Sequence, residues 1–180
     1  MENYIRRYDN VVPPELCDSL IKKFETNPDH YEKHQQGLMS FTQINLINHK
    51  EWHKDAQTVA NNLTGCVDQY KKECNVLLGM WPNKYALEPL RMKRYLPDGT
   101  DQFGAHVDVD CHANAKRFLV FFLYLDDNEK GNTLFPQHDI SSECKKGSCL
   151  LFPPMWPWLH AGEKPIDKPK YIIGSYLHYV

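Results

Sequence analysis

The sequence predicts a mainly β domain, an all-β sandwich or jelly roll supported by N-terminal helices. Two amphipathic helical patterns lie before residue 85, and from residue 85 onward short segments rich in β-branched and aromatic residues alternate with turn clusters. The 180 residues suffice for one domain and are few for two. We therefore expect a single domain over residues 1–180, with residues 1–84 as a helical support region and residues 85–180 as the jelly-roll core.

The two helices are expected near the start of the chain. Pro13-Pro14-Glu15 favours a helix start, because proline is tolerated in the first turn and an early acidic residue suits the helix dipole. This helix should end near Asn27-Pro28. A second helix is expected from roughly residue 50 to 76, where apolar residues recur at spacings of three and four. Residues 38–47, between the helices, are expected to be extended.

The predicted strands share β-branched or aromatic residues bounded by turn-forming clusters. They cover residues 90–95, 104–109, 118–125, 148–152 and 171–179. Strands at this spacing, with no helices between them, are typical of a sandwich or jelly roll.

The composition excludes several classes of protein. The formal net charge is −2 and no long block of like charge occurs, so neither a nucleic-acid nor a membrane partner is expected. The chain lacks a signal-peptide pattern and a long apolar run, so a cytoplasmic protein is expected. The six cysteines form no C-x-x-C pair and are expected to be free thiols rather than zinc ligands.

The segment His106-Val107-Asp108 is a candidate metal-binding motif. It lies in a predicted strand, so both outer side chains should point to one face. Two histidines and a carboxylate suit Fe(II) and leave coordination positions open, but the third ligand must come from elsewhere. With nine histidines and 23 acidic residues, a His-x-Asp motif is close to a chance occurrence. Asp110 and His112 share the parity of this pair and are competing ligands.

A lysine in the last predicted strand is a candidate anion-binding residue. Lys170 shares one face of that strand with Ile172 and Tyr176. Strand lysines normally face solvent, and one that faces inward among such neighbours would need an anion, which a co-substrate carboxylate would supply. Lys168 has the same parity and could take this role if the preceding loop differs in length.

Four segments together resemble a known family. They are residues 8–17, residues 94–99 followed by 106–108, residues 117–127 with 131–136, and His160-Ala161-Gly162 with Lys170. In this order they resemble the prolyl 4-hydroxylase-like branch of the 2-oxoglutarate and Fe(II)-dependent oxygenases. The resemblance covers most of the chain and implies a double-stranded β-helix, that is, a jelly-roll core. The loop before Thr133 is one residue shorter than the family's Gly-Gly-x-Thr pattern, which leaves the role of Thr133 open.

The resemblance implies a set of site residues. His106, Asp108 and His160 would bind Fe(II), and Lys170 would pair with the distal carboxylate of 2-oxoglutarate. The remaining implied residues, near the co-substrate or the iron, are Tyr95, Tyr124, Thr133 and Tyr176. For the tyrosines the alternative is core packing.

Three further residues are candidates to contact the substrate. Arg91 and Lys93 share the parity of Tyr95 and, if they face inward, favour an acidic or carbonyl-rich substrate. Their alternative is a solvated strand face, because long cations usually stay in water. Trp158 lies just before His160 and either forms part of a substrate wall or packs in the core.

The implied activity is that of a 2-oxoglutarate- and Fe(II)-dependent dioxygenase, with ascorbate as a candidate reductant. The first hypothesis is hydroxylation of an unactivated C–H bond in a prolyl residue of a peptide or protein. The alternatives are hydroxylation of a free amino acid or other small molecule on the same fold, and a non-catalytic iron- or ligand-binding module.

Overall fold

Two α-helices precede most of the sheet. The computed structural model of the chain describes residues 4–180. Helix α1 (Pro14–Glu25) begins with proline and glutamate in its first turn, as predicted. Helix α2 (His53–Glu73) also lies where the sequence predicted it. The short 3-10 helices are η2 (Pro28–His30), η3 (Leu46–Asn48), η4 (Lys50–Trp52) and η5 (Trp156–Trp158).

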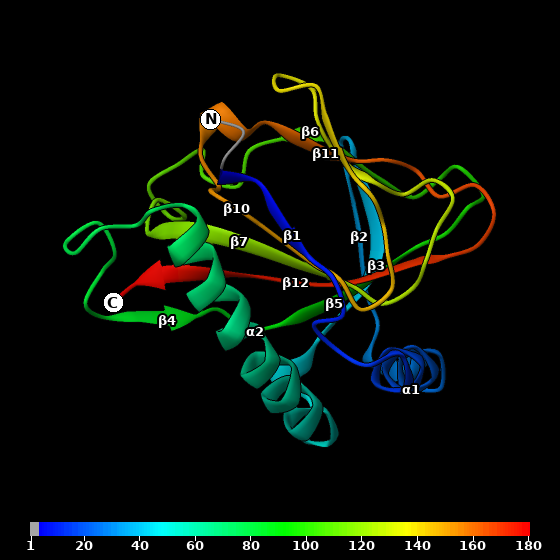
Figure 1. Cartoon of the computed structure of the whole chain (residues 1–180). Coiled ribbons are helices and arrows are strands. Elements are labelled where there is room, and N and C mark those ends of the chain that lie inside the picture. Colours follow the sequence, from blue (N-terminus) through cyan, green and yellow to red (C-terminus); the bar gives the residue numbers. More distant parts are fainter. Residues whose placement is uncertain (1–3) are drawn as a thin grey trace.

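The strands form one antiparallel sheet, which confirms the predicted mainly β fold with a jelly-roll core. They are β1 (Arg6–Tyr8), β2 (Glu32–Gln36), β3 (Met39–Asn45), β4 (Tyr85–Leu87), β5 (Arg91–Tyr95), β6 (Gln102–His106), β7 (Arg117–Tyr124), β8 (Thr133–Phe135), β9 (Ile140–Ser142), β10 (Cys149–Phe152), β11 (His160–Gly162) and β12 (Lys170–Tyr179). The order is β1-β10-β7-β12-β5-β3-β6-β11-β8-β9, with β2 on β3 and β4 on β12. Figure 1 shows the strands wrapping around a common interior.

Strands from the first part of the chain belong to the same sheet. β1 pairs with β10, and β3 pairs with both β5 and β6. The sheet is therefore not confined to residues 85–180. β1 and β2 escape prediction because β1 is only three residues long and β2 (EKHQQ) contains no apolar residue. The division into a helical support region and a jelly-roll core stays a prediction.

The two faces of the sheet bury different side chains. On β12, Ile173 packs in a cluster with Phe24 of α1, whereas its neighbour Ile172 packs with Tyr124 in a second cluster. Because successive strand residues point to opposite faces, the helices cover one face and the other lines the interior. The helices are seen together on one side of the sheet in Figure 1. Lys170 and Tyr176 share the parity of Ile172, so they belong to the interior face.

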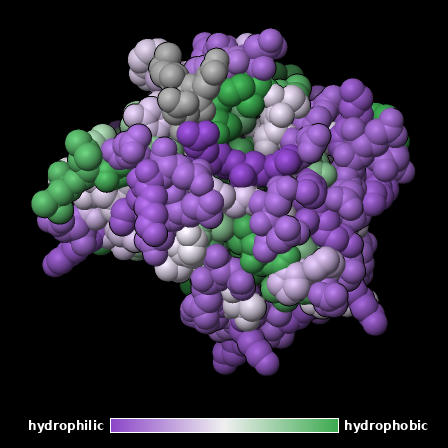
Figure 2. Space-filling view, in the orientation of Figure 1, coloured by the Kyte–Doolittle hydropathy of each residue, from purple (hydrophilic) through white to green (hydrophobic). Residues whose placement is uncertain are grey.

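The surface of the molecule is mostly polar. Figure 2 shows a predominantly hydrophilic face with an apolar patch at one edge, where the loop between α2 and β4 lies. The exposed apolar side chains of this loop are Leu77, Leu78 and Met80. Within residues 4–180, neither helix is long and apolar enough to cross a bilayer. The structure has no disulfide among the six cysteines, all of which lie within residues 4–180.

Candidate functional site

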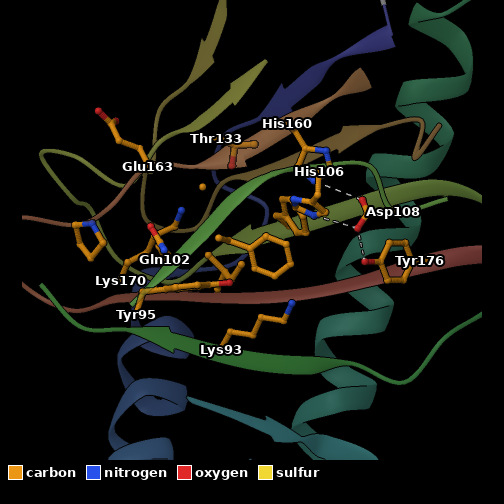
Figure 3. A pocket seen from close by; sticks show the side chains of 15 residues that line it. Lys93, Tyr95, Gln102, His106, Asp108, Thr133, His160, Glu163, Lys170 and Tyr176 are labelled. Atoms are coloured by element: carbon orange, nitrogen blue, oxygen red, sulfur yellow. Dashed lines mark hydrogen bonds and ion pairs between the residues drawn. The ribbon is translucent and has the colours of Figure 1, made fainter. Parts of the chain in front are cut away.

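Three side chains that meet inside the barrel form a group able to hold a metal ion: His106, Asp108 and His160. The Nε2 atoms of His106 and His160 lie 3.5 Å and 3.4 Å from the Asp108 carboxylate oxygens. Both Nε2 atoms and Asp108 Oδ2 are buried and have no hydrogen-bond partner among the described residues. Buried polar atoms normally have partners, so three such atoms facing one another indicate a position for a cation. Figure 3 shows their convergence.

The two histidines come from neighbouring strands. His106 is the last residue of β6 and pairs directly with His160, the first residue of β11. The predicted strand over residues 104–109 is wrong in its second half, because β6 ends at His106. The backbone N–H groups of Asp108 and Val109 instead donate to Pro154 O, each at 3.1 Å. This turn, and not strand alternation, brings Asp108 beside His106.

Backbone carbonyl groups orient both imidazole rings. His106 Nδ1 donates to Gly104 O at 2.9 Å, and His160 Nδ1 donates to Trp158 O at 3.1 Å. Since a carbonyl oxygen only accepts, each ring carries its proton on Nδ1 and directs the Nε2 lone pair into the site. Burial lowers the pKa of His160 to about 4, so this ring is neutral at pH 7.

Asp108 is held as a carboxylate. Burial by itself raises the pKa of Asp108, but its contacts with His106 and His160 and the hydrogen bond from Tyr176 lower it below its ordinary value. The Tyr176 hydroxyl donates to Asp108 Oδ1 at 2.7 Å. Tyr176 in turn packs under the Arg117 guanidinium, 3.8 Å from the ring centroid. Tyr176 thus lies beside the candidate metal position and acts on it through Asp108.

The competing pair lies outside this group. Asp110 is exposed, and Asn114 Nδ2 donates to its Oδ1 at 2.8 Å. His112 is also exposed. Neither residue contributes a ligand atom to a metal-binding group within residues 4–180. The tertiary structure therefore favours His106 and Asp108 over this pair.

A cavity of about 510 Å³, including its open mouth, connects the three residues to Lys170. The Lys170 side chain is only 3% exposed, and no carboxylate of the described residues lies within ion-pair distance of it. Burial lowers the pKa of Lys170. A buried ammonium without an anion is costly, so this site favours an anion from outside the chain. Lys168 is half-exposed and pairs with Asp126 Oδ2 at 3.0 Å, away from the cavity.

Tyrosines and a threonine surround the Lys170 ammonium. It lies 5.7 Å from the ring centroids of both Tyr95 and Tyr124. Tyr124 Oη and Thr133 Oγ1 are 2.6 Å apart, and Thr133 lines the cavity. Gly131 has φ of +94°, and a Cβ there would meet Lys170 Cδ at 3.1 Å. Glycine therefore permits the shortened loop before Thr133 to close over Lys170.

The three residues expected to contact the substrate have different positions. Lys93 lines the cavity. Arg91, the first residue of β5, does not, and its Nη1 lies 4.0 Å from Glu88 Oε2. Trp158 also does not line the cavity; its carbonyl orients His160 and its ring packs against Tyr4. For Trp158 the structure therefore favours packing over a place in a substrate wall.

Several residues that line the cavity were not predicted from the sequence: Gln102, Phe103, Phe122, Glu163 and Pro165. Phe122 shares strand parity with Tyr124, so that signal was present in the sequence. Glu163 and Pro165 lie in the loop between β11 and β12, where no periodicity exists to indicate direction.

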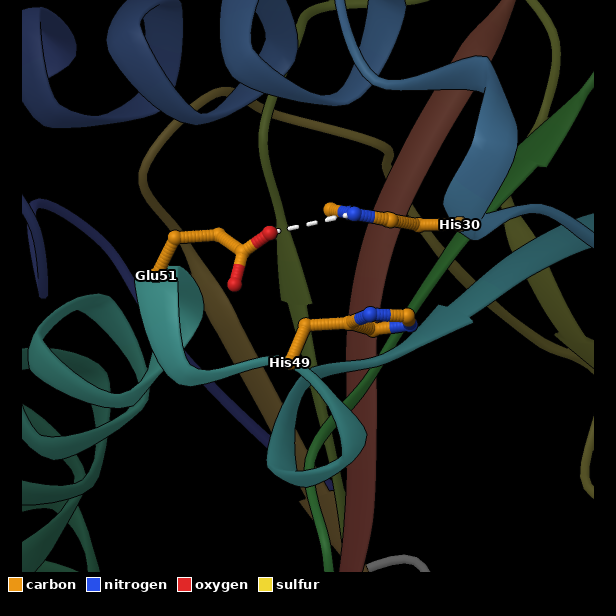
Figure 4. A group of neighbouring side chains, drawn as sticks. All are labelled: His30, His49 and Glu51. Atoms are coloured by element: carbon orange, nitrogen blue, oxygen red, sulfur yellow. Dashed lines mark ion pairs between the residues drawn. The ribbon is translucent and has the colours of Figure 1, made fainter.

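A second group of possible ligands, His30, His49 and Glu51, is unsuited to a metal ion (Figure 4). The His30 and His49 rings are stacked, with centroids 3.8 Å apart and planes 18° from parallel. Their in-plane lone pairs therefore do not converge on one point. His30 Nδ1 also accepts from Trp52 Nε1 at 3.3 Å, while its Nε2 lies 3.0 Å from Glu51. Both ring nitrogens of His30 are already used.

Comparisons with known proteins agree with this geometry. The family model of the 2OG-Fe(II) oxygenase superfamily matches residues 90–178. No curated protein sequence matches the chain closely enough to be counted as a relative.

Several solved structures have a similar fold. A 2OG complex of a viral collagen prolyl hydroxylase from Paramecium Bursaria Chlorella virus-1 aligns with a TM-score of 0.71 at 21% identity, over 98% of this chain and 96% of that one. A Pseudomonas putida prolyl-4-hydroxylase aligns with a TM-score of 0.68 at 12% identity, over 98% of this chain and 93% of that one. A Trichoplax adhaerens prolyl hydroxylase in complex with a hypoxia inducible factor peptide fragment aligns with a TM-score of 0.73 at 15% identity, over 98% of this chain and 84% of that one. At these identities the likeness concerns the fold.

Proposed function

The chain belongs to the 2OG-Fe(II) oxygenase superfamily and is a 2-oxoglutarate-dependent dioxygenase, and on this premise we propose that it hydroxylates prolyl residues of a peptide or protein. One observation carries the proposal. A single cavity has three unpartnered ligand atoms at one end and the unpaired ammonium of Lys170 at the other. The prolyl substrate is supported by the likeness in fold to prolyl hydroxylases, one of them bound to a peptide fragment.

We assign the Fe(II) ligands to His106, Asp108 and His160. Two imidazoles and a carboxylate are a donor set that suits Fe(II) and leaves positions open for other ligands. The carbonyl acceptors at the two Nδ1 atoms fix the ring tautomers before the metal binds. Removing either imidazole ring should therefore abolish metal binding and not merely change how the metal is oriented.

The 2-oxoglutarate site is assigned to the Lys170 end of the cavity. The Lys170 ammonium would pair with the distal carboxylate. The Thr133 hydroxyl, held by Tyr124, would donate to the same carboxylate. Tyr95 lies beside this ammonium and lines the cavity between Lys170 and the metal ligands.

When bound, Fe(II) and 2-oxoglutarate supply the oxidising chemistry: 2-oxoglutarate and dioxygen give succinate and CO2, and one oxygen atom enters a C–H bond of the substrate. The chain positions the reactants and keeps the site dry. Phe122 and Ile172 form apolar walls between the two ends of the cavity. Tyr176 holds Asp108 ionised and fixes its orientation.

The proposal is tested by product analysis. The protein is supplied with Fe(II), 2-oxoglutarate, dioxygen and proline-containing peptides, and succinate and peptide mass are measured. We expect succinate to form and one oxygen atom to be added to a prolyl residue located by tandem mass spectrometry. His106→Ala serves as the matched inactive control. Succinate formation without any modified proline in peptides or cell-lysate proteins would contradict the prolyl substrate, whereas no succinate from the wild type would contradict the whole assignment.

A further inference from the structure

The cavity contains a second lysine that the proposed function does not use. Lys93 lies on β5, which is paired on both sides, so that Lys93 is opposite Ile172 of β12 and Gln43 of β3. Its neighbour Met92 packs on the helix-covered face, in the cluster that contains Phe24 of α1. Lys93 must therefore point to the interior face. Figure 3 shows its ammonium group pointing into the cavity, toward the metal ligands.

The Lys93 ammonium has no anionic partner among residues 4–180. No hydrogen bond or ion pair within that range involves it, and its nearest ring contacts are Phe41 and Phe103, whose centroids lie 4.7 Å and 4.9 Å away. Aromatic faces attract a cation but carry no charge that could neutralise it. In contrast, the neighbouring cation Arg117 is paired with Glu88 at 2.8 Å. The Asp108 carboxylate acts on Lys93 electrostatically but forms no ion pair with it. Because Asp108 is assigned to the metal, Lys93 lacks a counter-charge of its own.

The co-substrate leaves this charge unmatched. In the proposed function the distal carboxylate of 2-oxoglutarate is paired with Lys170, and its other carboxylate faces the metal. Taken together, Fe(II), the 2-oxoglutarate dianion, the metal ligand Asp108 and Lys170 carry no net charge. Glu163, the other carboxylate that lines the cavity, pairs with Lys130 at 3.3 Å. The positive charge of Lys93 remains, in a cavity where an unpaired charge is costly.

We propose that Lys93 is a specificity-determining residue that binds a carboxylate of the prolyl substrate, adjacent to the proline that is hydroxylated. This inference rests on the proposed function. A carboxylate fits better than a backbone carbonyl because it supplies a full compensating charge together with a charge-assisted hydrogen bond. The carboxylate has two sources with the same chemistry: an acidic side chain next to the proline, or the α-carboxylate of a C-terminal proline.

The test is a set of matched peptide pairs titrated calorimetrically into the protein with Fe(II) and 2-oxoglutarate, without oxygen. One pair has Asp or Asn before the proline, one has Asp or Asn after it, and one ends in prolyl carboxylate or prolyl amide. We expect the wild type to bind the acid of at least one pair about tenfold more tightly than its neutral partner, as one charge-assisted hydrogen bond provides. Lys93→Met should bind both members equally, and Lys93→Arg should keep the preference. Lys54→Met, which removes an exposed lysine of α2, is the matched control and should behave as the wild type.

The outcomes separate the two proposals. A wild type that binds every acid and its neutral partner equally overturns the role of Lys93, whatever the variants do. So does an acid preference that survives in Lys93→Met, or a loss of 2-oxoglutarate binding in that variant, which would assign Lys93 to the co-substrate. If the wild type forms succinate but has no acid preference, only this inference fails. If it forms no succinate, the proposed function fails with it.

Discussion

Replacing Lys170 by methionine should separate co-substrate binding from folding stability. Methionine is apolar and similar in length, so the cavity wall is kept while the charge is lost. The Lys170 side chain is 3% exposed and lacks an ionic partner within residues 4–180. A charge-assisted hydrogen bond contributes about 1.5–3 kcal/mol, so the KM for 2-oxoglutarate should rise about 10- to 150-fold.

The same substitution should not destabilise the protein when 2-oxoglutarate is absent. It removes an unpaired buried charge, whose desolvation opposes folding, so the variant should be at least as stable as the wild type. Burial lowers the pKa of Lys170, so between this lowered pKa and the ordinary value of 10.5 the unfolded chain binds more protons than the folded one. The wild type should therefore gain stability as the pH rises through the lowered pKa toward 10.5, and the advantage of the variant should shrink there.

Two measurements check this reasoning: succinate formation against 2-oxoglutarate concentration, and urea unfolding of the protein without ligands at several pH values. Lys168→Met is the matched control, because Lys168 is half-exposed and pairs with Asp126. It should leave the KM unchanged. An unchanged KM in Lys170→Met, or a raised KM in Lys168→Met, would refute the assignment of the distal carboxylate. A strongly destabilised Lys170→Met would refute the claim that the buried charge is unpaired.

Three further predictions concern the rest of the site. His106→Ala should lose bound Fe(II) in a metal analysis while Asp110→Ala keeps it, and the reverse result would mean that the competing pair binds the metal. Burial lowers the pKa of His160 from 6.5 to about 4, so between pH 6.5 and about 4 the unfolded chain binds more protons than the folded one. The metal-free protein should therefore lose about 3 kcal/mol of unfolding free energy as the pH falls through this range. His160→Gln should lack this slope in denaturant titrations, and a persistent slope would assign it to another group. Tyr124→Phe leaves the Thr133 hydroxyl without its 2.6 Å partner and should cost about 1–3 kcal/mol in urea unfolding, whereas no change would mean that water replaces the bond.

Much of the fold was predictable because it follows from local periodicity. The apolar stripes predicted α1 and α2. Segments rich in β-branched and aromatic residues, bounded by turn clusters, predicted β5, β7, β10 and β12. The short strands were not predictable. β9 and β11 are each three residues long, too short for alternation to be distinguished from chance. They form because neighbouring strands supply hydrogen-bond partners, which is information that lies elsewhere in the chain.

The sequence by itself determined which faces the side chains share. Strand parity placed Lys170, Ile172 and Tyr176 together, and it placed Arg91 and Lys93 with Tyr95. All of these residues except Arg91 line one cavity in the structure. Parity is a local property, so it needs no knowledge of the partner strand.

Only the tertiary structure decided between residues of equal parity. Asp108 and Asp110 have the same parity, but the two hydrogen bonds to Pro154 O end the strand and turn Asp108 toward His160. Lys168 and Lys170 also share parity, but only Lys170 enters β12 and becomes buried. In each pair the choice depends on where a strand begins or ends against a distant segment. The spacing of residues along the chain does not predict where the strand begins or ends.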